Sequence, residues 1–165
     1  LTASVCNLNP TSRGTVHVAS PDPRKAPRIQ PNYLSTPEDR QVAADSLRLT
    51  RRIAAQPALA RYQPQELKPG VQFQSDEDLA RLAGDIGTTI FHPVGTARMG
   101  KDPKTSVLNA HNQCWDVPNL FIQGASAFPQ NAGYNPTGTV AALAYHSADA
   151  IVNQYLKSPG PLVHA

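Results

Sequence analysis

Hydrophobic and polar residues alternate at the start of the chain. Two alternating runs, TASVCNL and TVHVAS, are joined by the segment Asn9–Gly14, which contains one proline. Alternation bounded by Pro and Gly is typical of two paired strands with a loop longer than two residues. We therefore predict a hairpin over Leu1–Ser20. The five prolines of Ser20–Pro37 then predict an extended connector, with at most an edge strand around Arg28–Tyr33, because proline removes backbone donors.

The apolar residues next take the period of a helix. Thr36 followed by Pro37–Asp39 is a helix start, because a hydroxyl cap, a proline in the first turn and two acids suit the positive end of the helix dipole. We predict that this helix ends near Gln56. A second, shorter helix is predicted over Asp76–Ala83, after a loop at Tyr62–Gly70.

The last third of the chain combines one predicted strand with one predicted helix. The short apolar run Asn119–Ala125 favours a buried strand, and Thr137–Tyr155 has the spacing of a long helix. The apolar residues on or near one face of this helix are Val140, Leu143, Ala144, Ala148, Ile151 and Val152. Together these elements predict an α+β fold.

Length and composition are those of one globular domain. A chain of 165 residues can bury a sizeable core, and no apolar run approaches the 18 residues or so that a membrane span needs. The first residue is Leu1, and no charged segment leads into an apolar run, so no signal peptide is visible and we expect a further segment upstream. The compartment is not determined.

Charge and cysteine content favour neither nucleic-acid nor metal binding. The net charge is +3, from 15 basic and 12 acidic residues that are interspersed, whereas a nucleic-acid surface needs a basic stripe. Cys6 and Cys114 lie far apart; we expect free thiols, with a single disulfide as the alternative. No pair of histidines has metal-ligand spacing, so we predict no metal site.

One histidine stands out from the other four. His92 lies in the segment TIFHPVGTARMG, where Pro93 and Gly95 set the direction of the backbone. Histidine can serve as a proton acceptor near neutral pH. The alternative is a histidine that merely bonds a nearby carbonyl. His92 is thus a candidate base.

A second candidate is Asn135, immediately before Pro136 and the predicted helix. Its side chain could cap the helix, and the helix start also offers free N–H groups to an electron-rich ligand. An amide at this place could also donate a hydrogen bond to a bound ligand.

These two segments resemble the C-terminal part of the glucose-methanol-choline (GMC) family of flavin-dependent oxidoreductases. In that family a His-Pro-x-Gly-Thr turn and an Asn-Pro-x-x-Thr turn face the reactive edge of FAD. The upstream stretch NPTSRGTVHVASPDPRKAPRIQPNYLSTPED is similar to the family's Pro-x-Ser-Arg-Gly strands and Asn-Tyr-Leu turn, so the resemblance covers nearly the whole chain. It implies oxidation of a primary or secondary alcohol (alcohol, sugar or choline-like), with His92 as base and Asn135 as its partner.

The resemblance also implies which residues approach the cofactor. Gly124 and Ala125 match an Asp-Ala-Ser segment near the FAD phosphate and ribityl groups, with Gly124 in place of the usual acid. The residues expected at the pyrimidine end of the flavin are Asn135, Pro136, Thr137 and Thr139. None of the ten glycines forms a Gly-x-Gly-x-x-Gly turn, which cradles the pyrophosphate. FAD binding is therefore expected to need an N-terminal segment outside this chain.

The resemblance suggests how the chain divides. Residues 1–118 correspond mostly to the substrate-binding region, residues 119–157 to a strand, turn and helix that complete the FAD-binding domain, and residues 158–165 to a tail. The implied partners are the alcohol, the N-terminal FAD-binding segment and, in some members, an electron-acceptor subunit. Two alternatives are a noncatalytic binding or assembly module that keeps the scaffold, and a metal-dependent hydrolase using His92. Which alcohol is oxidised and which acceptor takes the electrons are not determined by the sequence.

Overall fold

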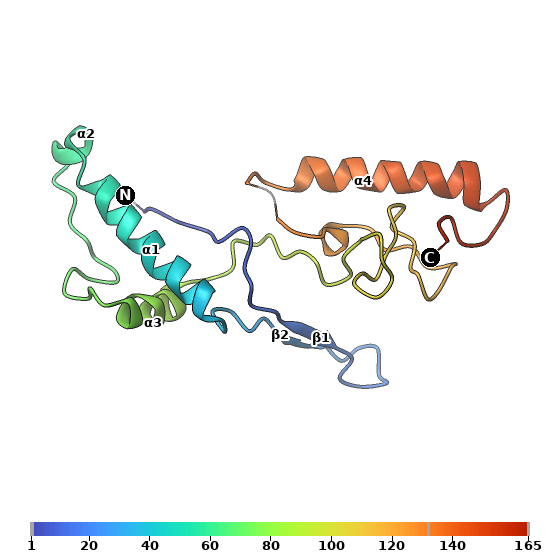
Figure 1. The fold of residues 1–165 in the computed structure, drawn as a ribbon, viewed down its shortest axis with the longest axis horizontal. Coiled ribbons are helices and arrows are strands. Elements are labelled where there is room, and N and C mark those ends of the chain that lie inside the picture. Colours follow the sequence, from blue (N-terminus) through green and yellow to red (C-terminus); the bar gives the residue numbers. More distant parts are fainter. Residues whose placement is uncertain (1, 132, 165) are drawn as a thin grey trace. The chain divides into compact units, whose positions relative to one another are not determined.

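The computed structural model describes residues 2–131 and 133–164. The chain divides into two compact units, Leu1–Thr88 and Thr89–Ala165, which are described one at a time (Figure 1). The combination of helices with a small antiparallel sheet confirms the predicted α+β class. The predicted division at residue 118 concerns domains of a longer protein and stays a prediction.

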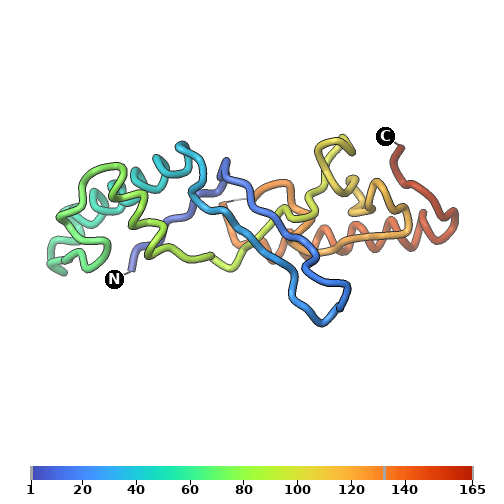
Figure 2. Tube along the Cα trace, turned by 90° about the horizontal axis from the view of Figure 1, so that it is seen from below, coloured from blue at the N-terminus to red at the C-terminus, as the bar shows by residue number. Residues whose placement is uncertain are grey.

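The first unit is built around two helices. Helix α1 (Pro37–Ala54) begins as predicted, since the Thr36 side chain accepts a hydrogen bond from the N–H of Asp39. Helix α3 (Asp76–Ile86) runs three residues beyond the predicted end, and the two helices lie side by side (Figure 2). Their shared core consists of Ala44, Leu79 and Ala80. A short helix, α2 (Pro57–Ala60), was not predicted.

The sheet of the first unit corrects the predicted hairpin. Strand β1 (Thr15–His17) pairs in antiparallel register with β2 (Arg28–Gln30), rather than with the first alternating run. The expected edge strand is thus confirmed, while the hairpin over Leu1–Ser20 is wrong. The physical reason is that backbone N–H groups after the first run bind the carboxylate of Asp39 instead of a strand. The prolines lie mostly in the loop between β1 and β2, where they cost no ladder bond.

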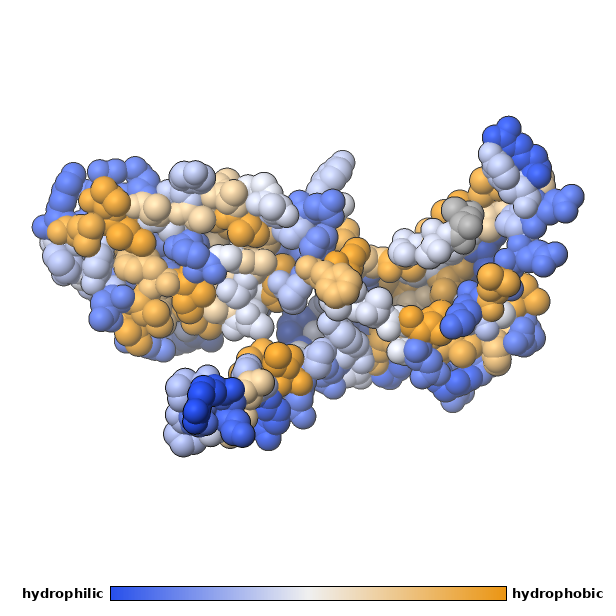
Figure 3. Space-filling view, turned by 180° about the vertical axis from the view of Figure 1, so that it is seen from behind, coloured by the Kyte–Doolittle hydropathy of each residue, from blue (hydrophilic) through white to orange (hydrophobic). Residues whose placement is uncertain are grey.

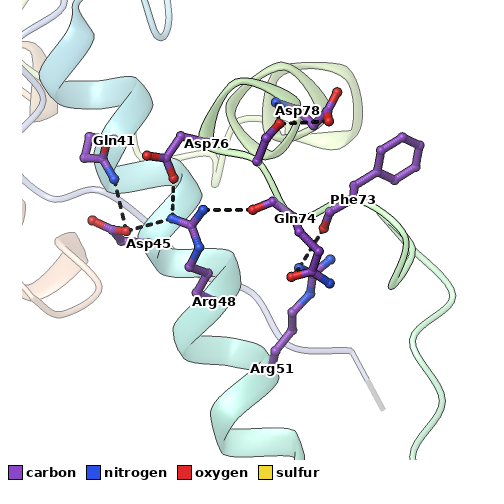
Figure 4. A network of polar contacts seen from close by, with 9 residues as sticks. Gln41, Asp45, Arg48, Arg51, Phe73, Gln74, Asp76 and Asp78 are labelled. Carbon is purple, nitrogen blue, oxygen red and sulfur yellow. Dashed lines mark hydrogen bonds and ion pairs between the residues drawn. The ribbon is translucent and has the colours of Figure 1, made fainter.

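Arginines on α1 fix the loop between the helices (Figure 4). Arg51 forms a two-point ion pair with Glu66, with N···O distances of 2.8 and 2.9 Å. It also donates to the carbonyl oxygens of Gly70 and Phe73. Arg48 bonds the carboxylate of Asp76 and the carbonyl of Gln74. The predicted loop at 62–70 is therefore an ordered segment fastened to α1.

The second unit contains one long helix and many turns. Helix α4 (Thr137–Ala150) continues as a π turn (Ile151–Tyr155), which confirms the predicted span. The predicted strand at 119–125 does not form; only an isolated bridge joins Phe121 to Gln113. The extended run ends because Gly124 adopts φ 106° and leads into the 3-10 turn Ala125–Ala127.

The predicted face of α4 is largely confirmed. Val140, Leu143, Ala144 and Ile151 are half-buried as expected, whereas Ala148 and Val152 are exposed. Ser147 and Ala150 are buried instead, at 0% and 2% exposure. The face facing the rest of the unit therefore follows positions 143, 147 and 150, a spacing typical of one helix face.

The buried side-chain carboxamide of Gln113 holds the C-terminal segment in place. Gln113 Nε2 donates to the carbonyl oxygens of Pro118 (2.7 Å) and Gly160 (2.8 Å). Its Oε1 accepts from the N–H of Leu162 (2.7 Å) and from the Asn109 side chain (3.1 Å). The segment expected to be a tail is thus part of the second unit.

Both units expose large apolar side chains (Figure 3). The chain exposes 11936 Å², whereas a compact monomer of this length exposes about 8,000 Å² and two separate compact domains of half the length about 9,600 Å² in total. The most exposed apolar side chains are Val18, Leu67, Phe91, Tyr134 and Tyr145. The excess surface is what a protein has when part of its packing partner lies elsewhere.

Two smaller findings concern the membrane and the thiols. Across residues 2–131 and 133–164, the structure contains no helix with the length and apolar character of a membrane span. Cys6 and Cys114 are both free thiols, the first exposed and the second half-buried.

Candidate active site

The His92 turn has an unusual backbone. Phe91, directly before the histidine, has φ 62°, and Gly95 has φ 82°. A positive φ is rare for a bulky residue and costs about 1–3 kcal/mol. The Phe91 side chain is 81% exposed, so its own packing does not compensate that cost, while the imidazole of His92 is half-buried. Such strain is concentrated at functional sites.

The segment that follows His92 is hydrogen-bonded to the 3-10 turn Ala125–Ala127. The N–H of Ala97 donates to the Ser126 carbonyl (3.0 Å), and the N–H of Met99 to the Ala127 carbonyl (2.8 Å). A Cβ at Gly95 would lie 3.4 Å from the carbonyl oxygen of Phe128, so the backbones approach closely here. The His turn and the Gly124–Ala127 segment are therefore one backbone assembly.

Gly124 needs to be glycine for its backbone. Its φ of 106° and ψ of −174° lie in a region that is essentially limited to glycine. A Cβ at Gly124 would meet no heavy atom within 4 Å, so dihedral angles rather than crowding impose the residue. Ala125, the first residue of the 3-10 turn, accepts through its carbonyl from the N–H of Phe128.

Asn135 does not act as a helix cap. The cap position of α4 is Pro136, and no side chain accepts from the first turn. Asn135, Thr137 and Thr139 are exposed. Because the first N–H groups of a helix have no partner inside it, this end of α4 offers donors to a ligand and leaves the Asn135 amide free for another task.

A pocket of about 300 Å³ lies beside the start of α4. It is lined by Phe128, Pro129, Gln130, Tyr134, Asn135, Pro136, Thr139 and Leu143. Three of the predicted cofactor residues, Asn135, Pro136 and Thr139, are thus brought together. His92 is not part of this lining, so its proximity to Asn135 stays a prediction.

The sequence analysis did not identify Asn131 as a candidate site residue. Its Nδ2 donates to the carbonyl oxygen of His92 at 3.3 Å, and it precedes Asn135 by four residues in the same loop. A carboxamide in a Pro/Gly-rich loop resembles an ordinary turn residue, so only the contact itself distinguishes it.

Among residues 2–131 and 133–164, no three His, Cys, Asp or Glu side chains gather as metal ligands would. His111 and His146 stack with ring centroids 5.4 Å apart. Nearly parallel rings at this distance do not converge on a common ion.

The fold is that of known flavin-dependent enzymes. The structure superposes on pyridoxine 4-oxidase from Mesorbium loti with a TM-score of 0.79 and 32% identity, covering 88% of this chain and 28% of that one. The model of the GMC oxidoreductase C-terminal region matches residues 10–144. The chain therefore belongs to the GMC oxidoreductase family, which confirms the resemblance seen in its sequence.

Two relatives show how the similarity is distributed. A gluconate 2-dehydrogenase flavoprotein of Pantoea cypripedii is 64% identical over 81 residues, which is 47% of this chain and 13% of the relative. An oxygen-dependent choline dehydrogenase of Citrobacter koseri is 40% identical over 147 residues, covering 89% of this chain and 26% of the relative. The chain spans about a quarter of the length of such relatives.

Proposed function

We propose that this chain is the C-terminal portion of an FAD-dependent oxidoreductase that oxidises an alcohol, with His92 as the base. The observation that carries the proposal is the uncapped start of α4 beside Asn135, in the same unit as a strained His92 turn. Family membership gives these two features a common chemistry.

The residues present suit a flavin. The first turn of α4 offers N–H groups and a partial positive charge to an electron-rich group. Gly124 leaves open space where another residue would place a Cβ, as a backbone does where a ligand comes close. Asn135, Pro136, Thr137 and Thr139 would hold the pyrimidine end of FAD, while Gly124 and Ala125 would lie near its phosphate and ribityl groups. The pyrophosphate cradle would come from an N-terminal segment.

FAD, when bound, supplies the acceptor for the hydride that leaves the carbinol carbon. His92 takes the hydroxyl proton, since a neutral imidazole is the side-chain base available near neutral pH. The Asn135 amide donates a hydrogen bond to the oxygen as negative charge develops there. The two residues thus have separate tasks, one on the proton and one on the oxygen.

The substrate belongs to the class that the relatives suggest: a sugar acid such as gluconate, a choline-like alcohol or a simple alcohol. The pocket beside α4 is lined by apolar, amide and hydroxyl groups, which suit a neutral hydroxyl-bearing carbon.

The proposal is tested with His92→Ala in the complete flavoprotein, which carries the N-terminal segment. Gluconate, choline and benzyl alcohol are each mixed with the oxidised enzyme under anaerobic conditions, and flavin reduction is followed by stopped-flow absorbance. Loss of the base should slow reduction about 10²-fold or more. An unchanged rate would contradict the assignment. A yellow, folded enzyme reduced by no alcohol would favour a noncatalytic binding module.

A further inference from the structure

We propose that Asn131 is a positioning residue for His92. It touches the backbone of the histidine rather than the reacting atoms, and it determines where the imidazole points. This inference rests on the proposed function of His92 and adds a residue to that machinery.

The first argument is the contact itself. Asn131 Nδ2 lies 3.3 Å from the carbonyl oxygen of His92, and the Asn131 side chain is half-buried. The other hydrogen bonds between the two segments are made by backbone groups further along, at Ala97 and Met99. Asn131 therefore adds a hydrogen bond to the turn at the histidine itself.

The second argument is that the backbone needs such a contact at this place. The residue before the histidine, Phe91, has a strained φ of 62° and a side chain that is 81% exposed. Strained conformations persist only where surrounding contacts hold them. A hydrogen bond on the His92 carbonyl fixes the peptide group between His92 and Pro93, and so opposes relaxation of the turn.

The third argument concerns direction. A residue before proline is restricted in ψ, so Pro93 already narrows the conformations of His92. Anchoring the carbonyl oxygen removes much of the freedom that remains. Because a displacement of about 1 Å at a reacting group can cost roughly 10²-fold in rate, a bond to this oxygen can affect catalysis without touching the substrate.

The fourth argument is the place of Asn131 in the chain. It lies four residues before Asn135, which lines the pocket beside α4. The residue that contacts the proposed base is thus close in the sequence to the proposed oxygen-binding amide.

The test measures flavin reduction per bound FAD in the complete flavoprotein, with the best substrate among gluconate, choline and benzyl alcohol. Asn131→Ala removes the donor, and Asn131→Asp keeps the size but puts an acceptor opposite the His92 carbonyl. Each should lower the limiting rate about 10- to 100-fold, with a smaller change in KM. Asn153→Ala removes a carboxamide bonded to Asp149 at the far end of the unit and should leave the rate unchanged.

A double-mutant cycle separates positioning from general damage. If Asn131 acts through the histidine, adding Asn131→Ala to His92→Ala should slow reduction no further. An additional 10-fold loss in the double variant would overturn the proposal, as would a normal rate in both single Asn131 variants. If Asn131→Ala does not retain FAD, the Asn131→Asp pair provides the same cycle.

Failure of this inference differs from failure of the proposed function. A normal rate in His92→Ala would remove the base, and the positioning role with it. A slow His92→Ala beside normal Asn131 variants would remove only the positioning role.

Discussion

At the scale of single residues, Asp39 organises the first unit. Its side chain is 3% exposed and accepts from the N–H groups of Thr11 (2.9 Å) and Ser12 (2.8 Å) and from Asn7 Nδ2 (3.2 Å). Burial by itself would raise the pKa of the carboxyl group. The hydrogen bonds from Ser12 and Thr11 outweigh burial and lower the pKa from 3.8 to about 2.

Asp39→Asn should therefore destabilise the protein in a pH-dependent way. Because the folded pKa is the lower one, the carboxylate stabilises the fold above pH 4 or so, and this stabilisation is lost as pH falls towards about 2. The shift corresponds to about 2.5 kcal/mol. We expect the variant to lose about that much at pH 7 and pH 5, and less at pH 3, in thermal unfolding followed by circular dichroism. Asp45→Asn, at an exposed carboxylate of the same helix, is the control; an equal loss at every pH would refute the linkage.

Asn135 offers a second prediction at this scale, because its side chain caps no helix. Asn135→Asp should leave the melting temperature nearly unchanged. Flavin reduction in the complete enzyme should fall about 10²-fold, since an anion replaces a donor beside the developing alkoxide. Stopped-flow reduction and thermal unfolding are measured on the same preparation. Normal reduction kinetics would leave His92 as the sole catalytic group proposed here.

At the scale of elements, the start of α1 depends on neighbouring residues. The conformation of the loop after α2 depends instead on contacts with a residue of α1. The Thr36 cap needs only neighbouring residues. The loop is shaped by Arg51, whose guanidinium holds the pKa of Glu66 below its usual value and also binds two loop carbonyls. The order of this loop is therefore a consequence of α1.

Arg51→Lys should release the loop, because an ammonium group cannot bond Glu66, Gly70 and Phe73 in the geometry of a guanidinium fork. We expect a loss of about 1–3 kcal/mol in unfolding free energy. Amide hydrogen exchange should rise over residues 61–74. Arg52→Lys, at the exposed neighbouring arginine, is the matched comparison. Unchanged exchange in the Arg51 variant would show that the loop is ordered by other contacts.

At the scale of the whole molecule, the main observation is the large solvent-exposed area. The exposed area of 11936 Å² exceeds what even two separate compact domains of this length would show, about 9,600 Å². The relatives are about four times longer than the part they share with this chain. Both observations fit the proposal that this chain is the C-terminal portion of a longer flavoprotein.

The isolated chain should accordingly show neither turnover nor tight FAD binding. In the proposed function the pyrophosphate cradle would come from an N-terminal segment, and one helix start cannot replace it. Fluorescence titration with FAD compares the isolated chain with the protein that includes the N-terminal segment. Submicromolar affinity in the isolated chain would contradict the proposed division of labour.

The sequence by itself determined the features that depend on neighbouring residues. The α1 start, the span of α4 and the edge strand at Arg28–Gln30 follow from caps, prolines and periodicity, which act within a few residues. The His92 and Asn135 motifs are also short stretches of sequence, and they indicate the family to which the chain belongs. In each case, interactions between residues close in the sequence favour the observed feature.

Only the tertiary structure decided which segments meet. The first alternating run does not pair as predicted, and the N–H groups of Thr11 and Ser12 that follow it bind the carboxylate of Asp39, 28 residues beyond Thr11. Ser147 and Ala150 are the most deeply buried residues of α4, because the opposing surface decides which residues of the predicted face are covered completely. The proposed role of Asn131 depends on a contact with a residue 39 positions away. Hydrogen bonds between distant segments have no periodic signature in a sequence, since they depend on the folded path that brings the two groups together.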